Sequence, residues 1–248
     1  MTDSSNPAQA ADQDRPIAYW HRPGKGPTLI FLPGYMSDME GNKALALDAW
    51  AQAEGRAFIR FDYGGCGSSG GDFESQSFAD WRDDALAMVD QVAEGPVVLV
   101  GSSMGAWLML HVALARPEQV VGLVGIAAAP DFTDWGFSQE DKLKILQEGR
   151  LEQPSPYGEQ PTVTTRVFWQ SAEAMRLLHA PIAVDCPVRL LHGQSDPDVP
   201  WPYALELTKQ IRSADVQAIL VKDGDHRLSR DRDIALLIAT VRGLLEAA

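Results

Sequence analysis

Short apolar segments alternate with segments of helical period along most of the chain. The apolar segments are rich in Val, Ile and Leu and end at turn residues, which predicts β-strands. These predicted strands span residues 17–21, 28–32, 57–62, 97–100, 120–126, 188–192 and 216–221. Because helical segments lie between most of them, the chain is predicted to be an α/β protein, with a mostly parallel central sheet covered by helices on both faces.

Two of the helical segments have clear starting signals. After Ser77, apolar residues recur at helical spacing, and Ser77 with Asp80 forms a cap of the S-x-x-D kind. The last helix is predicted to open at Ser229, with apolar residues at positions 234, 237, 238, 241 and 244. Each of these helices is predicted to pack its apolar face on the sheet.

Residues 131–184 break the alternation and are predicted to form an inserted helical cap. Prolines occur at positions 154, 156 and 161 of this segment. Long irregular segments in compact α/β domains are commonly lids or binding elements. This one precedes the strand and loop that carry the candidate catalytic acid, which would lay it over the site. A purely structural helical insertion is the alternative. We expect aromatic and aliphatic side chains of the cap to line an apolar acyl pocket. The aromatic residues of the cap are Phe132, Trp135, Phe137, Tyr157, Phe168 and Trp169.

Length and charge narrow the classes of partner. A chain of 248 residues suits one large domain, divided here into a flexible tail (1–15), a core (16–130 and 185–248) and the cap (131–184). A net charge of -13 disfavours nucleic acid and anionic membranes as partners. The first fifteen residues lack a signal-peptide core and are too acidic for a mitochondrial transit peptide, and no apolar run is long enough to span a membrane.

The two cysteines, Cys66 and Cys186, lie in different sequence contexts. They form neither a disulfide framework nor a metal-binding pair, which predicts a reducing, cytoplasmic location. The acidic charge and the complete domain lead us to expect a monomer.

The strongest local motif is a strand, then Gly101-Ser102-Ser103-Met104-Gly105, then a helical segment. This G-x-S-x-G pattern is a nucleophile elbow, in which a tight strand-to-helix turn presents the serine hydroxyl above the edge of the sheet. Flanking glycines relieve crowding at such a turn. Ser103 is therefore the predicted nucleophile, because Ser102 has the wrong spacing to the glycines.

A serine hydroxyl needs a base to accept its proton, and the base needs a carboxylate to orient it. His226 follows the last predicted strand and precedes the last helix, where a base would reach the carboxyl edge of the sheet. Asp196 lies in the strand-end pattern H-G-x-x-D-x-x-V-P of residues 192–200, and the order Ser, Asp, His favours it as the acid. Asp198 is the alternative acid, and Asp225 is a weaker one because it is adjacent to the base.

The tetrahedral intermediate needs two hydrogen-bond donors for its oxyanion. The turn at Pro33-Gly34, which follows the second predicted strand, is the expected source of one of them. We predict the backbone N–H groups of Tyr35 and Met104 as the donors. The alternative for Pro33-Gly34 is an ordinary turn. Of the other histidines, His111 is predicted to lie in the core and His192 to brace the acid loop.

A second glycine-rich segment, Gly65 to Gly70, matches the dinucleotide pattern G-x-G-x-x-G. No helix is predicted to open at Gly70, so no helix N-terminus is available for a pyrophosphate. The segment is better interpreted as a loop close to the site, with Cys66 as an inert small residue and not a reactive thiol. The sequence also lacks metal-binding motifs. We therefore expect neither a cofactor nor a metal.

Several motifs together resemble one group of proteins. They are Leu32-Pro33-Gly34-Tyr35, Arg60-Phe61-Asp62-Tyr63, Gly101-Ser102-Ser103-Met104-Gly105, Trp107-Leu108-Met109-Leu110-His111, Ala115-Arg116-Pro117-Glu118, Arg189-Leu190-Leu191-His192-Gly193 and Asp225-His226-Arg227. The chain resembles the mitochondrial palmitoyl-protein thioesterases of the α/β-hydrolase-domain family, also described as acyl-glucuronide esterases. The resemblance implies the α/β-hydrolase fold, a triad of Ser103, Asp196 and His226, and acyl esters or thioesters, protein-linked or small, as substrates. The missing transit peptide suggests a bacterial relative.

Two other kinds of function remain open. A serine nucleophile on this fold is compatible with a short-chain carboxylesterase or with C–C bond hydrolysis. A non-catalytic protein could instead use the pocket for binding, because a fold does not fix a function.

Overall fold

A central sheet of eight strands runs through the part of the chain that this computed structural model describes, residues 8–10, 15–155, 158 and 160–247. The strands follow the order β1-β2-β4-β3-β5-β6-β9-β10. β1 and β2 are antiparallel to their neighbours, and the other pairings are parallel. The strands are β1 (Ala8–Ala10), β2 (Ile17–Arg22), β3 (Lys25–Leu32), β4 (Arg56–Phe61), β5 (Val97–Ser102), β6 (Val120–Ile126), β9 (Val188–Gly193) and β10 (Val216–Val221).

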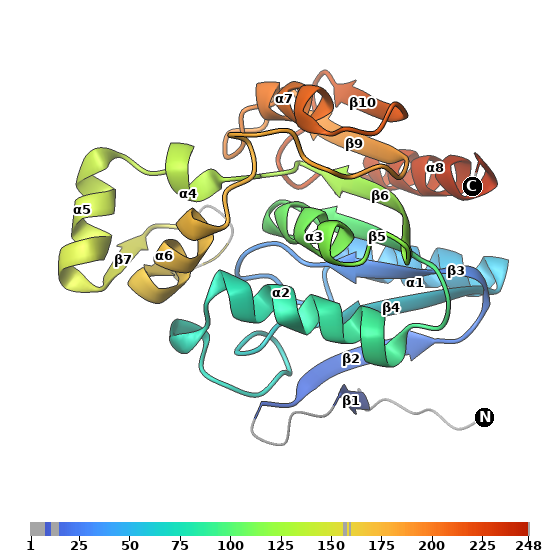
Figure 1. Cartoon of the computed structure of the whole chain (residues 1–248), viewed down its shortest axis with the longest axis horizontal. Helices are drawn as coiled ribbons and strands as arrows, with labels where there is room; N and C mark the ends of the chain where they lie inside the picture. Colours follow the sequence, from blue (N-terminus) through green and yellow to red (C-terminus); the bar gives the residue numbers. More distant parts are fainter. Residues whose placement is uncertain (1–7, 11–14, 156–157, 159, 248) are drawn as a thin grey trace.

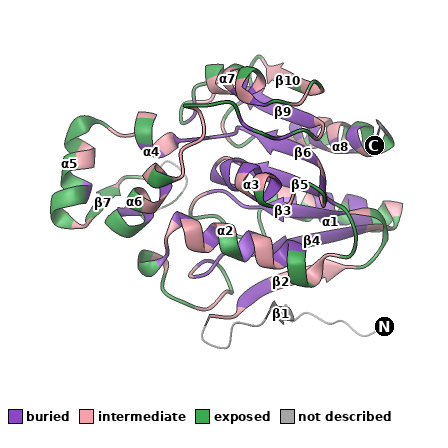
Figure 2. Cartoon of the chain, in the orientation of Figure 1, coloured by how far each residue is buried: buried purple, intermediate pink, exposed green. Residues whose placement is uncertain are grey.

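Helices cover both faces of this sheet (Figure 1). They are α1 (Asn42–Glu54), α2 (Phe78–Ala87), which continues into a π-helical turn (Met88–Val92), α3 (Met104–Ala115), α7 (Pro202–Gln210) and α8 (Asp231–Ala247). One apolar layer packs α1 and α8 on the sheet, and the other packs α2, α3 and α7. The central strands β4, β5, β6 and β9 are largely buried (Figure 2). None of the described helices is both long and apolar enough to cross a membrane.

The predicted strands are present in the structure, and β3 begins three residues earlier than predicted, at Lys25. The capping box between Ser77 and Asp80 is confirmed. The last helix begins at Asp231, later than predicted, because Ser229 donates its hydroxyl to the Arg227 carbonyl while Asp233 accepts the backbone N–H of Arg230.

The expected N-terminal tail is only partly described. Residues 1–7 and 11–14 lie outside the described residues, whereas residues 8–10 form β1 along β2. Arg15 donates hydrogen bonds to Gln76 (2.6 Å) and to the buried Asp84 (2.6 Å). These contacts join the end of the tail segment to the core.

Residues 131–184 contain both helices and strands, whereas the sequence predicted helices. The elements are α4 (Phe132–Trp135), α5 (Gln139–Glu148), β7 (Arg150–Gln153), β8 (Thr162–Thr165) and α6 (Arg166–Ala174). β7 and β8 form a separate antiparallel pair. Figure 1 shows this segment at one end of the molecule, beyond the sheet. Its strands have only four residues each, which is too short to give a clear alternating pattern.

Asp131 fastens the two ends of this segment together. It is buried and has a left-handed backbone conformation (φ 55°, ψ 27°). Its carboxylate accepts the N–H groups of Leu177 (2.9 Å) and Leu178 (2.8 Å). Burial raises the pKa of Asp131, and these two N–H donors oppose that effect by stabilising the charged form.

Two glycines, Gly101 and Gly105, make the tight turn between β5 and α3 possible. A Cβ at Gly105 would lie 2.2 Å from the Leu32 carbonyl oxygen and 2.4 Å from that of Pro33. A Cβ at Gly101 would lie 2.5 Å from the Gly105 carbonyl oxygen. The start of α3 therefore packs backbone against backbone on the turn after β3, which only glycine permits.

Gly105→Ala should lower the free energy of unfolding by about 1–3 kcal/mol, the usual cost of overpacking. The matched control is Gly243→Ala in α8, where a Cβ would meet no atom within 4 Å. This control should be neutral or stabilising by about 0.5–1 kcal/mol, because Ala favours helix over Gly. Denaturant unfolding measures both variants. Equal stability of Gly105→Ala and the wild type would contradict the described contact.

Candidate active site

Ser103 lies at the junction of β5 and α3 with a strained backbone. Its φ of 52° and ψ of -116° are rarely adopted by a residue with a side chain. Its N–H donates to the Ile126 carbonyl (2.8 Å), which ties the junction to β6. This is the geometry expected of a nucleophile elbow.

The turn after β3 lies directly beside Ser103. A Cβ at Gly34 would be 3.5 Å from the Cβ of Ser103. Ser37 donates its N–H to the Gly34 carbonyl (3.2 Å), and the adjacent Met36 has a φ of 52°. Within the described parts of the chain, the N–H groups of Tyr35 and Met104 donate to no protein acceptor. Both predicted oxyanion donors are thus free of competing bonds there.

The buried carboxylate of Asp62 stabilises the turn after β3 by hydrogen bonds. Asp62 accepts the N–H of Met39 (2.7 Å) through one oxygen and the N–H of Ser68 (2.8 Å) through the other. Asp62 therefore joins the turn after β3 to the glycine-rich loop after β4. Burial raises the pKa of Cys66 in that loop to about 12, which fits an inert thiol.

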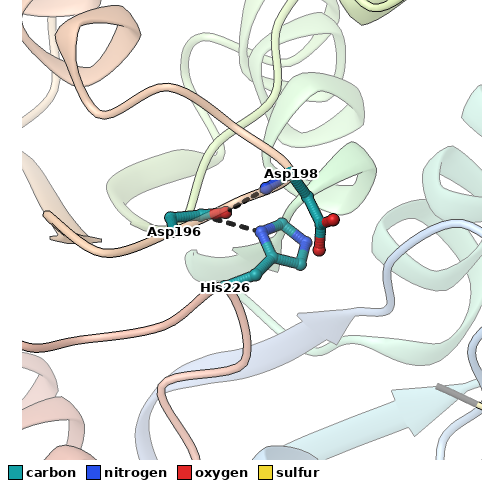
Figure 3. Close-up of side chains that lie close together, drawn as sticks. All are labelled: Asp196, Asp198 and His226. Atoms are coloured by element: carbon teal, nitrogen blue, oxygen red, sulfur yellow. Dashed lines mark hydrogen bonds and ion pairs between the residues drawn. The ribbon is translucent and has the colours of Figure 1, made fainter. Parts of the chain in front are cut away.

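Asp196 and His226 form a hydrogen-bonded pair (Figure 3). His226 Nδ1 lies 2.8 Å from Asp196 Oδ2, so the ring donates this bond to the carboxylate. The Asp196 side chain is 0% exposed, and its Oδ1 accepts the N–H groups of Asp198 (2.8 Å) and Val199 (2.9 Å). The carboxylate is therefore fixed in position from its own loop.

His192 supports the same carboxylate. Its Nε2 donates to the Val199 carbonyl (2.9 Å) and lies 3.3 Å from Asp196 Oδ2. Burial by itself would raise the pKa of Asp196, but the bonds from His192 and His226 outweigh it and hold that pKa well below the usual range. His192 lies where the sequence predicted, bracing the acid loop.

The alternative acids have other partners or positions. Asp225 Oδ1 accepts the Leu228 N–H (2.9 Å), which uses this carboxylate in its own turn. Asp198 is exposed, and its carboxylate lies beside the His226 ring in Figure 3. Asp196, Asp198 and His226 each place a possible metal-ligand atom within 4.8 Å of the others. However, both oxygens of Asp196 already accept N–H donors, which suits a residue that orients a base better than a metal ligand.

One cavity of about 620 Å³ brings the separate parts of the site together. Ser103 and His226 both line it, as do Tyr35 and Lys43. On the side of segment 131–184 its lining residues are Ser155, Gly158, Gln160 and Thr162. The nucleophile and base candidates therefore share a single space with the turn that carries the predicted oxyanion donor Tyr35.

Comparison with known proteins places the chain in a family. Residues 27–147 match the family model described as serine aminopeptidase, S33. The human protein named palmitoyl-protein thioesterase ABHD10, mitochondrial, is 45% identical over 93% of this chain and 76% of its own length. The structure of mouse α/β-hydrolase domain-containing protein 10 superposes with a TM-score of 0.91 at 44% identity, covering 98% of this chain and 99% of that one. The chain belongs to the ABHD10 family of α/β hydrolases.

A bacterial structure in the comparison is also similar. A putative hydrolase from Agrobacterium vitis has a TM-score of 0.90 at 37% identity, and the match covers 97% of this chain and 98% of that one. The α/β-hydrolase fold and the resemblance predicted from the sequence motifs are confirmed.

Three of the aromatic residues expected to line an apolar pocket make their contacts elsewhere. Among the described ones, Phe132 and Phe168 pack on Tyr35 and the core, with ring centroids 6.0 and 4.8 Å from that of Tyr35. Trp135 stacks on Tyr203 at 4.3 Å. Tyr157 lies outside the described residues. The described cavity is lined on this side by Ser155, Gly158, Gln160 and Thr162, while Phe132, Phe168 and Trp135 join the segment to the core.

Lys43 is a site residue that the sequence analysis missed. It lies in the first turn of α1, far in the sequence from the motifs, and its Nζ donates to the Arg227 carbonyl (2.6 Å) next to His226. Burial and the nearby Arg227 charge lower the pKa of Lys43 to about 8. No local pattern marks this lysine, because only the fold brings α1 to the loop after β10.

Asp196→Asn should reduce kcat for an activated ester by about 10⁴, because the amide cannot hold the tautomer and charge of the base. Asp198→Asn, the matched control two residues away, should cost far less, since its carboxylate does not bond to Nδ1. Steady-state kinetics on both variants, with circular dichroism as a check of folding, measures the difference. The reverse ranking would move the role of acid to Asp198.

Proposed function

We propose that the chain is a serine hydrolase that cleaves acyl esters and thioesters through an acyl-enzyme, with Ser103, His226 and Asp196 as its triad. One observation carries the proposal. Ser103, on a strained elbow, shares a cavity with His226. Nδ1 of the His226 ring donates a hydrogen bond to the buried carboxylate of Asp196. A hydroxyl nucleophile requires this combination of exposure, base and oriented tautomer.

In the proposed reaction, His226 accepts the Ser103 proton as the serine oxygen attacks the acyl carbonyl carbon. The N–H groups of Tyr35 and Met104 donate to the oxyanion that forms. His226 then gives the proton to the departing thiol or alcohol, and the C–S or C–O bond breaks. Water repeats the sequence on the acyl-enzyme, releasing the acid and regenerating Ser103. Asp196 stabilises the imidazolium in both halves.

The substrate proposal rests on the relatives. ABHD10 of human and mouse is named a palmitoyl-protein thioesterase, and identities of 45% and 47% over 93% of this chain support acyl thioesters, protein-linked or small, as substrates here. The triad acts on the acyl carbonyl and not on the leaving atom, so oxygen esters should also react.

We further propose that the protein is a monomer in the cytoplasm. The free thiols of Cys66 and Cys186 fit a reducing compartment.

A short-chain carboxylesterase is the second candidate. It is favoured by the wall of the cavity, where Ser155, Gly158, Gln160 and Thr162 offer little apolar surface to an acyl chain.

Ser103→Ala should reduce kcat by about 10⁴- to 10⁶-fold, as in other triads, because the variant lacks the hydroxyl that forms the proposed acyl-enzyme. The same variant should lose labelling by a fluorophosphonate probe, whereas Ser102→Ala, one residue earlier, should keep it. Labelling that persists in Ser103→Ala would contradict the proposed nucleophile. An unlabelled, well-folded wild type would favour a binding protein.

A chain-length series separates the two candidates. Each acyl methylene that becomes buried contributes about 0.8 kcal/mol, so kcat/KM for p-nitrophenyl esters should rise from acetyl toward medium or long chains if a thioesterase pocket is present. Matching acyl thioesters should be hydrolysed in parallel. A sharp optimum at acetyl, with thioesters inert, would leave the short-chain carboxylesterase.

A further inference from the structure

The side chain of Tyr35 reaches out of the turn after β3 into segment 131–184. Its hydroxyl donates a hydrogen bond to the Val163 carbonyl of β8 at 2.6 Å, across 128 positions of sequence. Burial raises the pKa of Tyr35 far above the usual range, so the hydroxyl stays protonated and remains a donor.

Aromatic rings from both sides hold the Tyr35 ring. On the core side it meets Phe73 and Trp81 edge-on, with centroids 5.7 Å away in each case. On the segment side it meets Phe132 at 6.0 Å and Phe168 at 4.8 Å. Edge-to-face and tilted pairs at these distances are favourable beyond the area that they bury. The ring is therefore a packed joint between the core and the segment.

The acceptor lies next to the wall of the cavity. Val163 follows Thr162 directly, and Thr162 and Gln160 both line the cavity that contains Ser103. The hydrogen bond thus holds the wall-forming stretch at a fixed distance from the turn. The same residue carries the N–H that the mechanism uses as an oxyanion donor. The turn is also strained at the next residue, Met36, whose φ is 52°, so its geometry depends on outside support.

We propose that Tyr35 is a positioning residue that couples the cavity wall at residues 160–163 to the oxyanion donor, through its side chain and its backbone respectively. The inference rests on the proposed function for the role of the N–H. If the wall is displaced, the Tyr35 N–H moves relative to the oxyanion, which changes kcat as well as substrate binding. A residue that only stabilised the fold would change the unfolding temperature and leave kcat per active site intact.

The test compares Tyr35→Phe with a matched control, Tyr203→Phe. The first variant keeps the ring and removes only the hydroxyl that bonds to Val163. The second removes the hydroxyl at another joint between core and segment, where Tyr203 stacks on Trp135. Amide hydrogen exchange of peptides covering β7 and β8 reports on the wall. The turnover of p-nitrophenyl acetate, per active site titrated with a fluorophosphonate, reports on the oxyanion.

In Tyr35→Phe, exchange in β8 should speed up and kcat should fall by about three- to tenfold, the effect of losing one neutral hydrogen bond. KM should change less than kcat. Tyr203→Phe should match the wild type in both measurements. Unchanged exchange in Tyr35→Phe, or faster exchange with an unchanged kcat, would overturn the coupling. A wild type that neither reacts with the probe nor turns over substrate would overturn the proposed function, and the coupling with it. Failure of the coupling alone is recognised because the wild type then remains active.

Discussion

The contact between the start of α3 and the turn after β3 is the constraint on which the site depends. Gly105 lets the helix backbone approach the carbonyl oxygens of Leu32 and Pro33 so closely that no side chain fits between them. This contact brings the turn beside Ser103 and places the N–H groups of Tyr35 and Met104 in the same region. Backbone contact fixes the start of the turn at Leu32 and Pro33, whereas the strained part at Met36 relies on the side-chain contacts of Tyr35. The strain at Ser103 is offset by the buried strand and helix on either side.

The parallel sheet positions the other half of the site, which consists of Asp196 and His226. The carboxyl ends of parallel strands meet at one edge, so the loops after β9 and β10 lie near those after β3 and β5. The Asp196 side chain in the first of these loops is not exposed to solvent, which is unfavourable for a carboxylate without partners. Bonds from His192, His226 and the N–H groups of its own loop keep it ionised. The bond to His226 also orients the proposed base, so one hydrogen bond both stabilises the carboxylate and positions the ring.

Local sequence patterns predicted much of this organisation, because strands, elbow and acid loop are each specified by neighbouring residues. The candidates Ser103, Asp196 and His226 could be named from such patterns, and the structure brings them to one edge of the sheet. The contributions of Lys43 and of the Tyr35 side chain could not be predicted, since each acts on a residue more than a hundred positions away. Aromatic residues of segment 131–184 were predicted to line a pocket, but Phe132, Phe168 and Trp135 pack on Tyr35 and Tyr203 instead. Composition predicts that such rings are buried, but it does not predict which residues they contact.

In the proposed mechanism, one serine carries the acyl group during turnover. Rapid acid quench of the wild-type protein with a p-nitrophenyl ester, followed by peptide mass spectrometry, detects this acyl-enzyme. An adduct of the acyl mass is expected on the peptide containing residues 101–105, localised to Ser103 by fragmentation. Hydrolysis that proceeds with the adduct on another residue, such as Lys43, would contradict the proposed mechanism.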